Sequence, residues 1–200
     1  MLIEHEGRTP QIDPSAWVAP TAVLSGDVRV GPDCRVLFGA VLSDEGGPVE
    51  VAERAIVMEN ALIRGRGGHA TRIGRNVIVG PHAHVNGAVV GDDAFLATGA
   101  ALFPGARIGA GAEVRIHGVV HVNSVLPAGG LVPMGWVAVG DPAEVLPPDR
   151  HDDIWAIQEG LDFPGTVFGF PRDTPDLQAR VARRYADLFG RHRDDRILDT

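Results

Sequence analysis

Aliphatic residues recur about every six positions along most of the chain, and each is followed by a small or polar residue. The repeat starts at Ile12, Val18, Leu24, Val30 and Val36, and it returns at Ile73, Val79, Val90, Leu96, Leu102 and Ile108. Four positions after such a start stands Ala, Val or Cys, as at Ala16, Ala22, Val28, Cys34, Ala40, Val77, Ala83, Ala94, Ala100, Ala106 and Ala112. Both positions must point inward, so the period predicts an all-β solenoid of hexapeptide coils rather than helices or a flat sheet.

Three hexapeptides make one triangular coil of about eighteen residues, and stacked coils lie about 4.8 Å apart because their backbones pair as parallel strands. The small residue is needed where the chain turns a corner and a larger side chain would collide inside. Two interruptions, at residues 43–48 and 65–71, predict loops that leave the coil and could carry functional side chains. We predict that the β-helix domain comprises residues 10–146.

A different pattern begins at Pro147-Pro148. Residues 152–157 predict a short helix, residues 161–171 predict an extended segment, and residues 175–192 carry apolar side chains at helical spacing. We therefore expect residues 147–200 to form a C-terminal helical extension that packs on the β-helix.

Composition narrows the classes of partner. The net charge is −8 and arginines are scattered among acidic residues, so the sequence has no basic stripe of the kind that binds nucleic acid. The sequence has no long apolar run that would predict a membrane partner. The first six residues include Glu4 and Glu6 where a signal peptide would be basic, so we expect a cytoplasmic protein. Cys34 is the single cysteine, which excludes an internal disulfide and predicts a buried core thiol.

Four segments carry a more specific signal: Gly-Ala-Val-Leu at residues 39–42, Gly-Pro-Val-Glu-Val at 47–51, Val-Gly-Pro-His-Ala-His-Val-Asn-Gly at 79–87 and Val-Ala-Val-Gly-Asp-Pro-Ala at 137–143. In these segments the chain resembles the gamma-class carbonic anhydrases of the hexapeptide-repeat superfamily. The resemblance implies a left-handed parallel β-helix with a C-terminal α-helix along its side, and a homotrimer with metal sites between subunits.

The family binds zinc through three histidines, one after an aliphatic coil start and two in the pattern Ile-Gly-His-x-x-x-x-His-Gly. Aligning these patterns with the chain puts Arg64, Pro81 and Asn86 at the three positions. None of them is an imidazole, and the permanent charge of Arg64 opposes a divalent cation. The resemblance therefore implies a degenerate zinc site and a protein that is not a standard CO2 hydratase. The family's Gln-Asp pair corresponds to Met58-Glu59 here.

Three groups of side chains are candidates for a site. Glu45 and Glu59 would form a charged cluster with Arg64, either as general bases or in a structural ion pair. The residues of the second group, His82 and His84, flank an inward-facing Ala83, so their imidazoles should project to one outer side. They would chelate a metal together with His69 or contact another subunit. In the third group, His121 aligns with the column of Arg64, Asn86 and Phe103, while His117 lies nearby or is simply exposed.

The leading hypothesis is a homotrimer that binds a small polar molecule or anion in the cleft between subunits. Arg64, Asn86, His82 and Met58 would bind this ligand. Glu59, His84 and Glu45 would be the catalytic groups if acid–base or lyase chemistry is retained, and the sequence does not decide whether the chain is an enzyme.

Three alternatives come from other classes. One is a coenzyme-A-dependent acyltransferase with His69 as its base, which rests on fold analogy. Another is a metal-dependent hydratase whose relocated ligands are His69, His82 and His84. The third is a non-catalytic assembly subunit that uses aromatic residues of its tail. No cofactor is firmly implied, and zinc or another divalent metal enters only with the relocated site.

Overall fold

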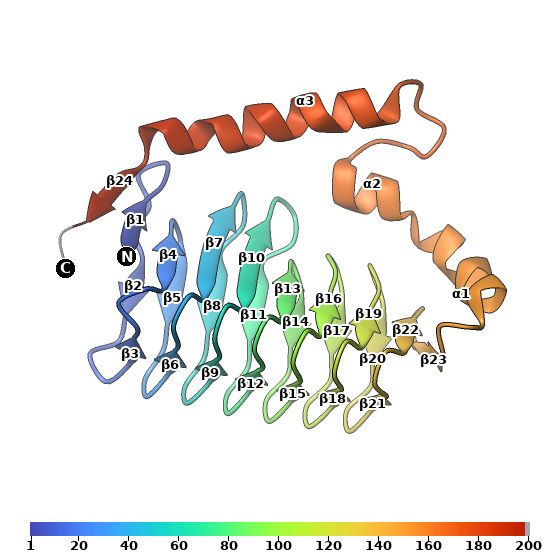
Figure 1. Cartoon of the computed structure of the whole chain (residues 1–200), viewed down its shortest axis with the longest axis horizontal. Coiled ribbons are helices and arrows are strands. Elements are labelled where there is room, and N and C mark those ends of the chain that lie inside the picture. Colours follow the sequence, from blue (N-terminus) through green and yellow to red (C-terminus); the bar gives the residue numbers. More distant parts are fainter. Residues whose placement is uncertain (199–200) are drawn as a thin grey trace.

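The computed structural model describes residues 1–198 as a left-handed parallel β-helix with a helical C-terminal segment lying along it (Figure 1). The chain winds around a triangular prism, and the strands of each coil pair with the strands of the next coil. The predicted all-β solenoid is confirmed. No helix within residues 1–198 has both the length and the apolar character needed to cross a membrane.

The prism has three faces, each of which is one sheet. The first face contains β24 (Arg196–Leu198), β1 (Leu2–Glu4), β4 (Val23–Ser25), β7 (Val41–Glu45), β10 (Leu62–Arg66), β13 (His84–Asn86), β16 (Ala101–Leu102), β19 (Val119–Val120), β22 (Val137–Val139) and β23 (Glu144–Leu146) in spatial order. The second face contains β2 (Gln11–Ile12), β5 (Val28–Val30), β8 (Val49–Val51), β11 (Thr71–Ile73), β14 (Val89–Val90), β17 (Arg107–Ile108) and β20 (Val125–Leu126). The third face contains β3 (Trp17–Val18), β6 (Arg35–Val36), β9 (Ile56–Val57), β12 (Ile78–Val79), β15 (Phe95–Leu96), β18 (Glu113–Val114) and β21 (Leu131–Val132).

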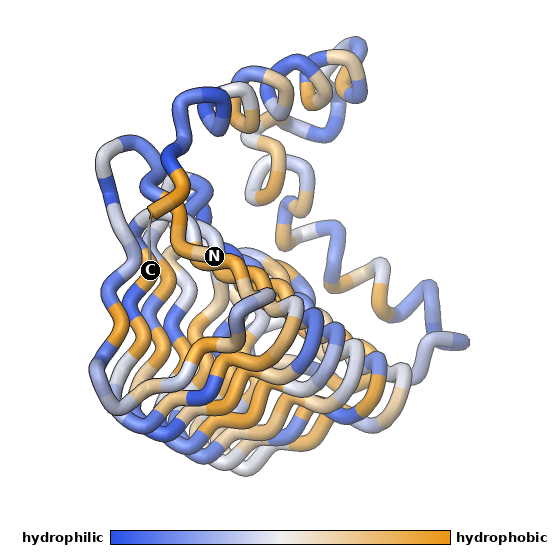
Figure 2. Tube along the Cα trace, turned by 60° about the vertical axis from the view of Figure 1, so that its left-hand side comes forward, coloured by the Kyte–Doolittle hydropathy of each residue, from blue (hydrophilic) through white to orange (hydrophobic). Residues whose placement is uncertain are grey.

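The core is a stack of aliphatic side chains, one layer per coil. On the first face Leu24, Leu42, Ile63, Val85 and Leu102 occupy equivalent register positions, and all five are fully buried. Hydrophobic segments accordingly repeat from coil to coil along the prism (Figure 2). The predicted inward positions are confirmed at Leu24 and Leu102.

Cys34 is buried in the core, as its place in the repeat predicted. Its thiol donates to the carbonyl of Ala52 at 2.9 Å, and burial raises the pKa of the thiol. A protonated, enclosed thiol is a structural group, not a nucleophile.

The two predicted interruptions are extensions of neighbouring strands. β7 and β10 continue past the corner between the first and second faces and pair there through Glu45 and Arg66 (Figure 1). Tight turns then return the chain to β8 and β11. These extensions bring the charged residues at the strand ends up to the C-terminal helices.

The C-terminal segment consists of α1 (His151–Gln158), a 3-10 turn η1 (Glu159–Leu161), α2 (Phe163–Phe168), α3 (Leu177–Gly190) and a second 3-10 turn η2 (Arg191–Asp194). The helices predicted near residues 152–157 and 175–192 are confirmed by α1 and α3. The extended segment predicted at residues 161–171 is wrong, because α2 forms there. Its start is stabilised by the side chain of Asp162, which accepts from the Gly165 amide at 3.2 Å, and Pro164 lies in the first turn, where no amide donor is needed.

The two ends of the described chain meet on the first face. β24 pairs with β1 in antiparallel fashion, with Ile3 opposite Ile197 and Glu4 opposite Arg196. The sheet thus includes residues on both sides of the predicted 10–146 segment. This pairing covers the open edge of the first coil, which would otherwise offer unpaired backbone groups to another chain.

Candidate functional site

The column of side chains expected from the repeat lies on the outer side of the first face. Arg64 on β10 is in register with Asn86 on β13. The next coils continue the column with Phe103 and His121, each directly after a paired strand. The ring centroids of Phe103 and His121 lie 6.3 Å apart.

Arg64 and Asn86 each have one polar atom that is buried and unpaired. Nε of Arg64 and Oδ1 of Asn86 are enclosed and find no hydrogen-bond partner among residues 1–198. The side chain of Asn86 is only 6% exposed, and the guanidinium of Arg64 lies 5.8 Å from the ring of Phe189 on α3. Since buried polar groups normally have partners, an unpaired donor beside an unpaired acceptor points to a group that the chain itself does not supply.

Two histidines border this pair. Burial lowers the pKa of His84, and the positive charge of Arg64 lowers it further. Burial also lowers the pKa of His121, whose ring lies 5.6 Å from that of Phe163 on α2. Both imidazoles are therefore neutral at pH 7, so each has a free lone pair on one ring nitrogen.

A groove of about 860 Å³ runs beside the column, between the extended ends of β7 and β10 and the helices α2 and α3. Its arginines are Arg66, Arg180, Arg183, Arg184 and Arg191, and its acidic residues are Glu45 and Asp187. A smaller cavity that includes Arg64 shares Glu45, Arg66, Tyr185 and Leu188 with this groove. The groove is thus positively charged in a protein whose net charge is −8.

Three of these arginines are held in place by contacts that do not neutralise them, whereas Arg191 pairs with Glu6 at 3.2 Å. Arg66 donates to the carbonyl of Val167 at 2.6 Å, Arg180 donates to the carbonyl of Pro175, and Arg184 lies over the ring of Phe170. Arg183 has no ion pair within residues 1–198.

The predicted charged cluster is not formed within one chain. Across the described residues, neither Glu45 nor Glu59 is ion-paired with Arg64. Glu45 is 8% exposed and instead contacts Nε2 of His192 at 3.3 Å. Glu59 and Met58 follow β9, at the corner between the third and first faces, because the repeat turns there.

The histidines proposed as relocated metal ligands lie at two different corners. His82 is exposed in the turn before β13 with φ +56°, so only His84 lies on the strand. His69 lies in the turn between β10 and β11, at the corner between the first and second faces. Within residues 1–198, these three do not form a group of potential ligands within 4.8 Å of one another. His117 is exposed in a turn.

Two features were missed by sequence reasoning. His5, His192 and Asp195 form a cluster, although His5 and Asp195 are 190 positions apart. Asp44 is fully buried and pairs with Arg8 at 2.9 Å. No motif marks either feature, because both depend on the pairing of coils and of the chain ends.

The zinc that the resemblance implies does not fit the residues at its expected positions. Arg64 and Asn86 face the same space from adjacent strands, and Pro81 lies in the turn after β12. A guanidinium has no lone pair to donate, an amide oxygen is a weak ligand for zinc, and proline has no donor side chain. This donor set therefore does not hold a zinc ion.

Curated relatives match part of the chain. The chain is 36% identical over 99 residues to gamma carbonic anhydrase 3, mitochondrial, of Arabidopsis thaliana. The aligned region covers 46% of this chain and 38% of that protein. It is 28% identical over 100 residues to a carbonic anhydrase of Geobacillus kaustophilus, covering 50% and 55% respectively. The chain thus spans less than two thirds of either relative. No family model matches.

Among solved structures, a UDP-N-acetylglucosamine acyltransferase of Bacteroides fragilis is similar with a TM-score of 0.56 and 14% identity, over 86% of this chain and 90% of that one. At this identity the likeness concerns the fold, which is the hexapeptide β-helix.

Proposed function

We propose that this chain, which is similar to gamma carbonic anhydrases over about half of its length, is a homotrimer of that hexapeptide-repeat type and binds a small oxyanion without the family's zinc. The ligand would lie against Arg64 and Asn86 and extend toward the arginine-lined groove. Its class is a carboxylate or phosphate compound that also carries a hydrogen-bond donor.

The charge of the groove carries this proposal. Five arginines and two carboxylates line it, so an anion gains attraction from several directions in a partly enclosed space. Arg66, Arg180 and Arg184 are already held by backbone carbonyls or an aromatic ring, which reduces the conformational entropy that binding would cost.

The unpaired atoms at the end of the groove supply specificity. Nε of Arg64 is a donor and suits an anionic oxygen, whereas Oδ1 of Asn86 is an acceptor and requires a hydroxyl or N–H group on the same ligand. His84 is unprotonated at neutral pH because of burial and Arg64, so it can accept a proton from a ligand held there. Among the candidate acid–base residues, His84 therefore fits a catalytic role best.

A stripe of exposed apolar side chains supports the trimer. It follows the third face and its corner with the first face, and it consists of Trp17, Phe38, Ile116, Leu131 and Met134. Pro81 and Met58 line the same stretch of surface. Exposed apolar side chains gathered along one side of a protein are typical of an interface between subunits.

Light scattering on the purified protein is expected to give three times the mass of the chain. Leu131→Glu should yield monomers, because a carboxylate would be buried against apolar partners. Val89→Glu is the matched control, since Val89 is similarly exposed but lies on the second face. A monomeric unmodified protein would contradict the proposed assembly.

Arg64→Gln is expected to weaken binding of hydrogencarbonate or phosphate at least about tenfold, because it removes a charge-assisted hydrogen bond. Calorimetry at constant ionic strength measures this change. The same substitution should raise the pKa of His84 in an NMR titration, since the neighbouring positive charge is lost, while burial still holds that pKa below its ordinary value.

Arg75→Gln is the control, because Arg75 is exposed, pairs with Asp92 at 2.7 Å and lies at the corner opposite the first face. Equal anion affinity of the unmodified protein, Arg64→Gln and Arg75→Gln would overturn the proposal. Stabilisation by acetyl coenzyme A that survives Arg64→Gln and is lost in His69→Asn would favour the acyltransferase instead.

A further inference from the structure

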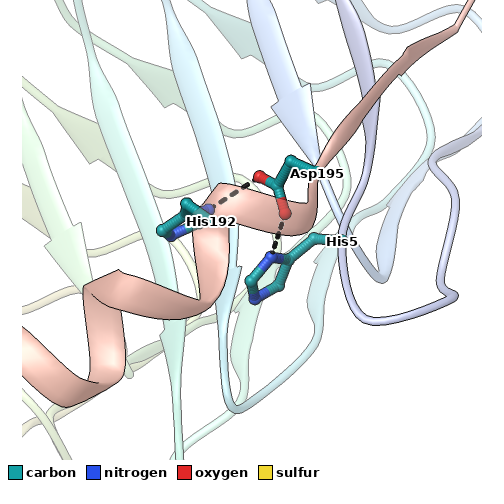
Figure 3. Close-up of side chains that lie close together, drawn as sticks. All are labelled: His5, His192 and Asp195. Carbon is teal, nitrogen blue, oxygen red and sulfur yellow. Dashed lines mark hydrogen bonds and ion pairs between the residues drawn. The ribbon is translucent and has the colours of Figure 1, made fainter.

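A compact group of histidines and carboxylates joins the two ends of the described chain. His5 follows β1, His192 lies in η2, and Asp195 directly precedes β24, so the pairing of β1 with β24 brings them together (Figure 3). Nδ1 of His5 lies 2.6 Å from Oδ1 of Asp195, and Nδ1 of His192 lies 2.8 Å from Oδ2. The two imidazole rings are stacked, with their centroids 4.3 Å apart.

This group is outside the Arg64 column and is largely enclosed. His5 is 3% exposed and the side chain of Asp195 is 15% exposed, while His192 closes the solvent side. A buried histidine that faces a partly buried carboxylate at the junction of two chain ends is unusual as a surface feature. Its position suggests a structural clamp.

We propose that His5, His192 and Asp195 form a binding site for a divalent transition-metal ion, with Zn²⁺ the best match. Their potential ligand atoms lie within 4.8 Å of one another. Two imidazoles and one carboxylate are the ligand set that zinc prefers among borderline donors, and water completes a tetrahedral site. The ion would bind the two Nδ1 atoms and the carboxylate in place of the protons that they now share, and the Nδ1–Oδ distances of 2.6 and 2.8 Å would lengthen to admit it.

Glu45 supplies the outer contact that such a site requires. With Nδ1 of His192 on the metal, its Nε2–H points to Oε2 of Glu45 at 3.3 Å. Histidines that bind metals usually donate their second ring N–H to a carboxylate or carbonyl, which fixes the orientation of the ring. The 8% exposure of Glu45 keeps this hydrogen bond away from competing water.

Nearby arginines do not oppose the ion, because they are paired with other carboxylates. Arg191 contacts Glu6 at 3.2 Å. Arg8 contacts Glu6 at 2.8 Å and Asp44 at 2.9 Å. The carboxylates of Asp195 and Glu45 therefore remain available to balance the charge of a divalent ion.

The site links the first strand to the last described one, so its occupancy stabilises the closed end of the prism. An ion that binds the folded chain and not the unfolded one raises the melting temperature with its concentration. At a free zinc concentration one hundred times Kd, we expect Tm to rise by about 5 to 10 °C.

The experiment uses the full-length, untagged protein after removal of metals with a chelator. Zinc titration followed by calorimetry and plasma mass spectrometry should give one ion per chain, and cobalt should produce the visible absorption of a four-coordinate site. His192→Asn and Asp195→Asn should abolish both signals. Glu45→Gln should weaken zinc binding about 10- to 100-fold without abolishing it, since Glu45 only orients a ligand.

His151→Asn is the control, because His151 is exposed at the start of α1. Circular dichroism tests whether each variant is folded. If His192→Asn is not folded, Asp195→Asn provides the second test. The proposal is wrong if zinc fails to bind the unmodified protein, or if folded His192→Asn and Asp195→Asn bind it as tightly as His151→Asn does.

Discussion

Gly65→Ala is expected to lower the free energy of unfolding by about 3 kcal/mol, because Gly65 on β10 lies too close to the turn between β7 and β8 to carry a side chain. A Cβ at this position would lie 1.9 Å from the carbonyl oxygen of Gly47 and 2.7 Å from that of Pro48. Both atoms belong to the backbone, so the whole β7–β8 turn would have to move away. Urea unfolding monitored by circular dichroism measures the loss.

Gly67→Ala is the matched control for this substitution. Gly67 lies two residues further along the chain, in the turn that follows β10, and the nearest atom to its added Cβ is 3.9 Å away. We expect a change below about 0.5 kcal/mol. Equal effects of the two substitutions would show that the strands separate at low cost, and would remove the steric explanation for the glycines of both extensions.

Asp44→Ala is expected to destabilise the protein by a similar amount, about 3 kcal/mol, because it removes a fully buried carboxylate that is paired and hydrogen-bonded. The carboxylate is 0% exposed and pairs with Arg8 at 2.9 Å. It also accepts from the amide of Asp27 at 3.1 Å and from that of Gly46 at 2.9 Å. Alanine leaves these donors without an acceptor and leaves a cavity beside Gly26.

The exposed residue Glu50 provides the comparison. It pairs with Arg29 at 3.5 Å and with Arg72 at 3.1 Å, and its side chain is 36% exposed. Solvent screens these contacts, so Glu50→Ala should cost less than about 1 kcal/mol. Thermal unfolding of both variants under identical salt conditions gives the comparison. A cost for Asp44→Ala as small as that for Glu50→Ala would mean that water replaces the buried carboxylate.

Much of the candidate site follows from the hexapeptide repeat. The column of Arg64, Asn86, Phe103 and His121 could be predicted because a fixed period puts equivalent positions of successive coils above one another. The predicted contact of Arg64 with acidic residues was not found within residues 1–198, since Glu45 instead turns toward His192. The partners of a side chain at a strand end depend on which distant segment covers it.

The tail illustrates the same limit. Helical spacing was sufficient to predict α1 and α3, but residues 161–171 have no clear period. There a single side-chain contact, from Asp162 to the Gly165 amide, favours a helical turn over an extended strand. The arginine groove also depends on the course of α3 over the ends of β7 and β10. The amphipathic pattern of α3 does not by itself determine that course.

The local repeat accounts for the prism, its buried aliphatic stack and the inward thiol of Cys34, because each coil repeats the same short-range pattern of inward and outward side chains. The remaining features, which are the histidine cluster and the arginine groove, form because the C-terminal segment returns to the first strand. It brings Asp195 to His5, His192 to Glu45 and the arginines of α3 to the extended strands. Such contacts join residues far apart in the chain, and their free energy comes from long-range packing and pairing that no sequence period encodes.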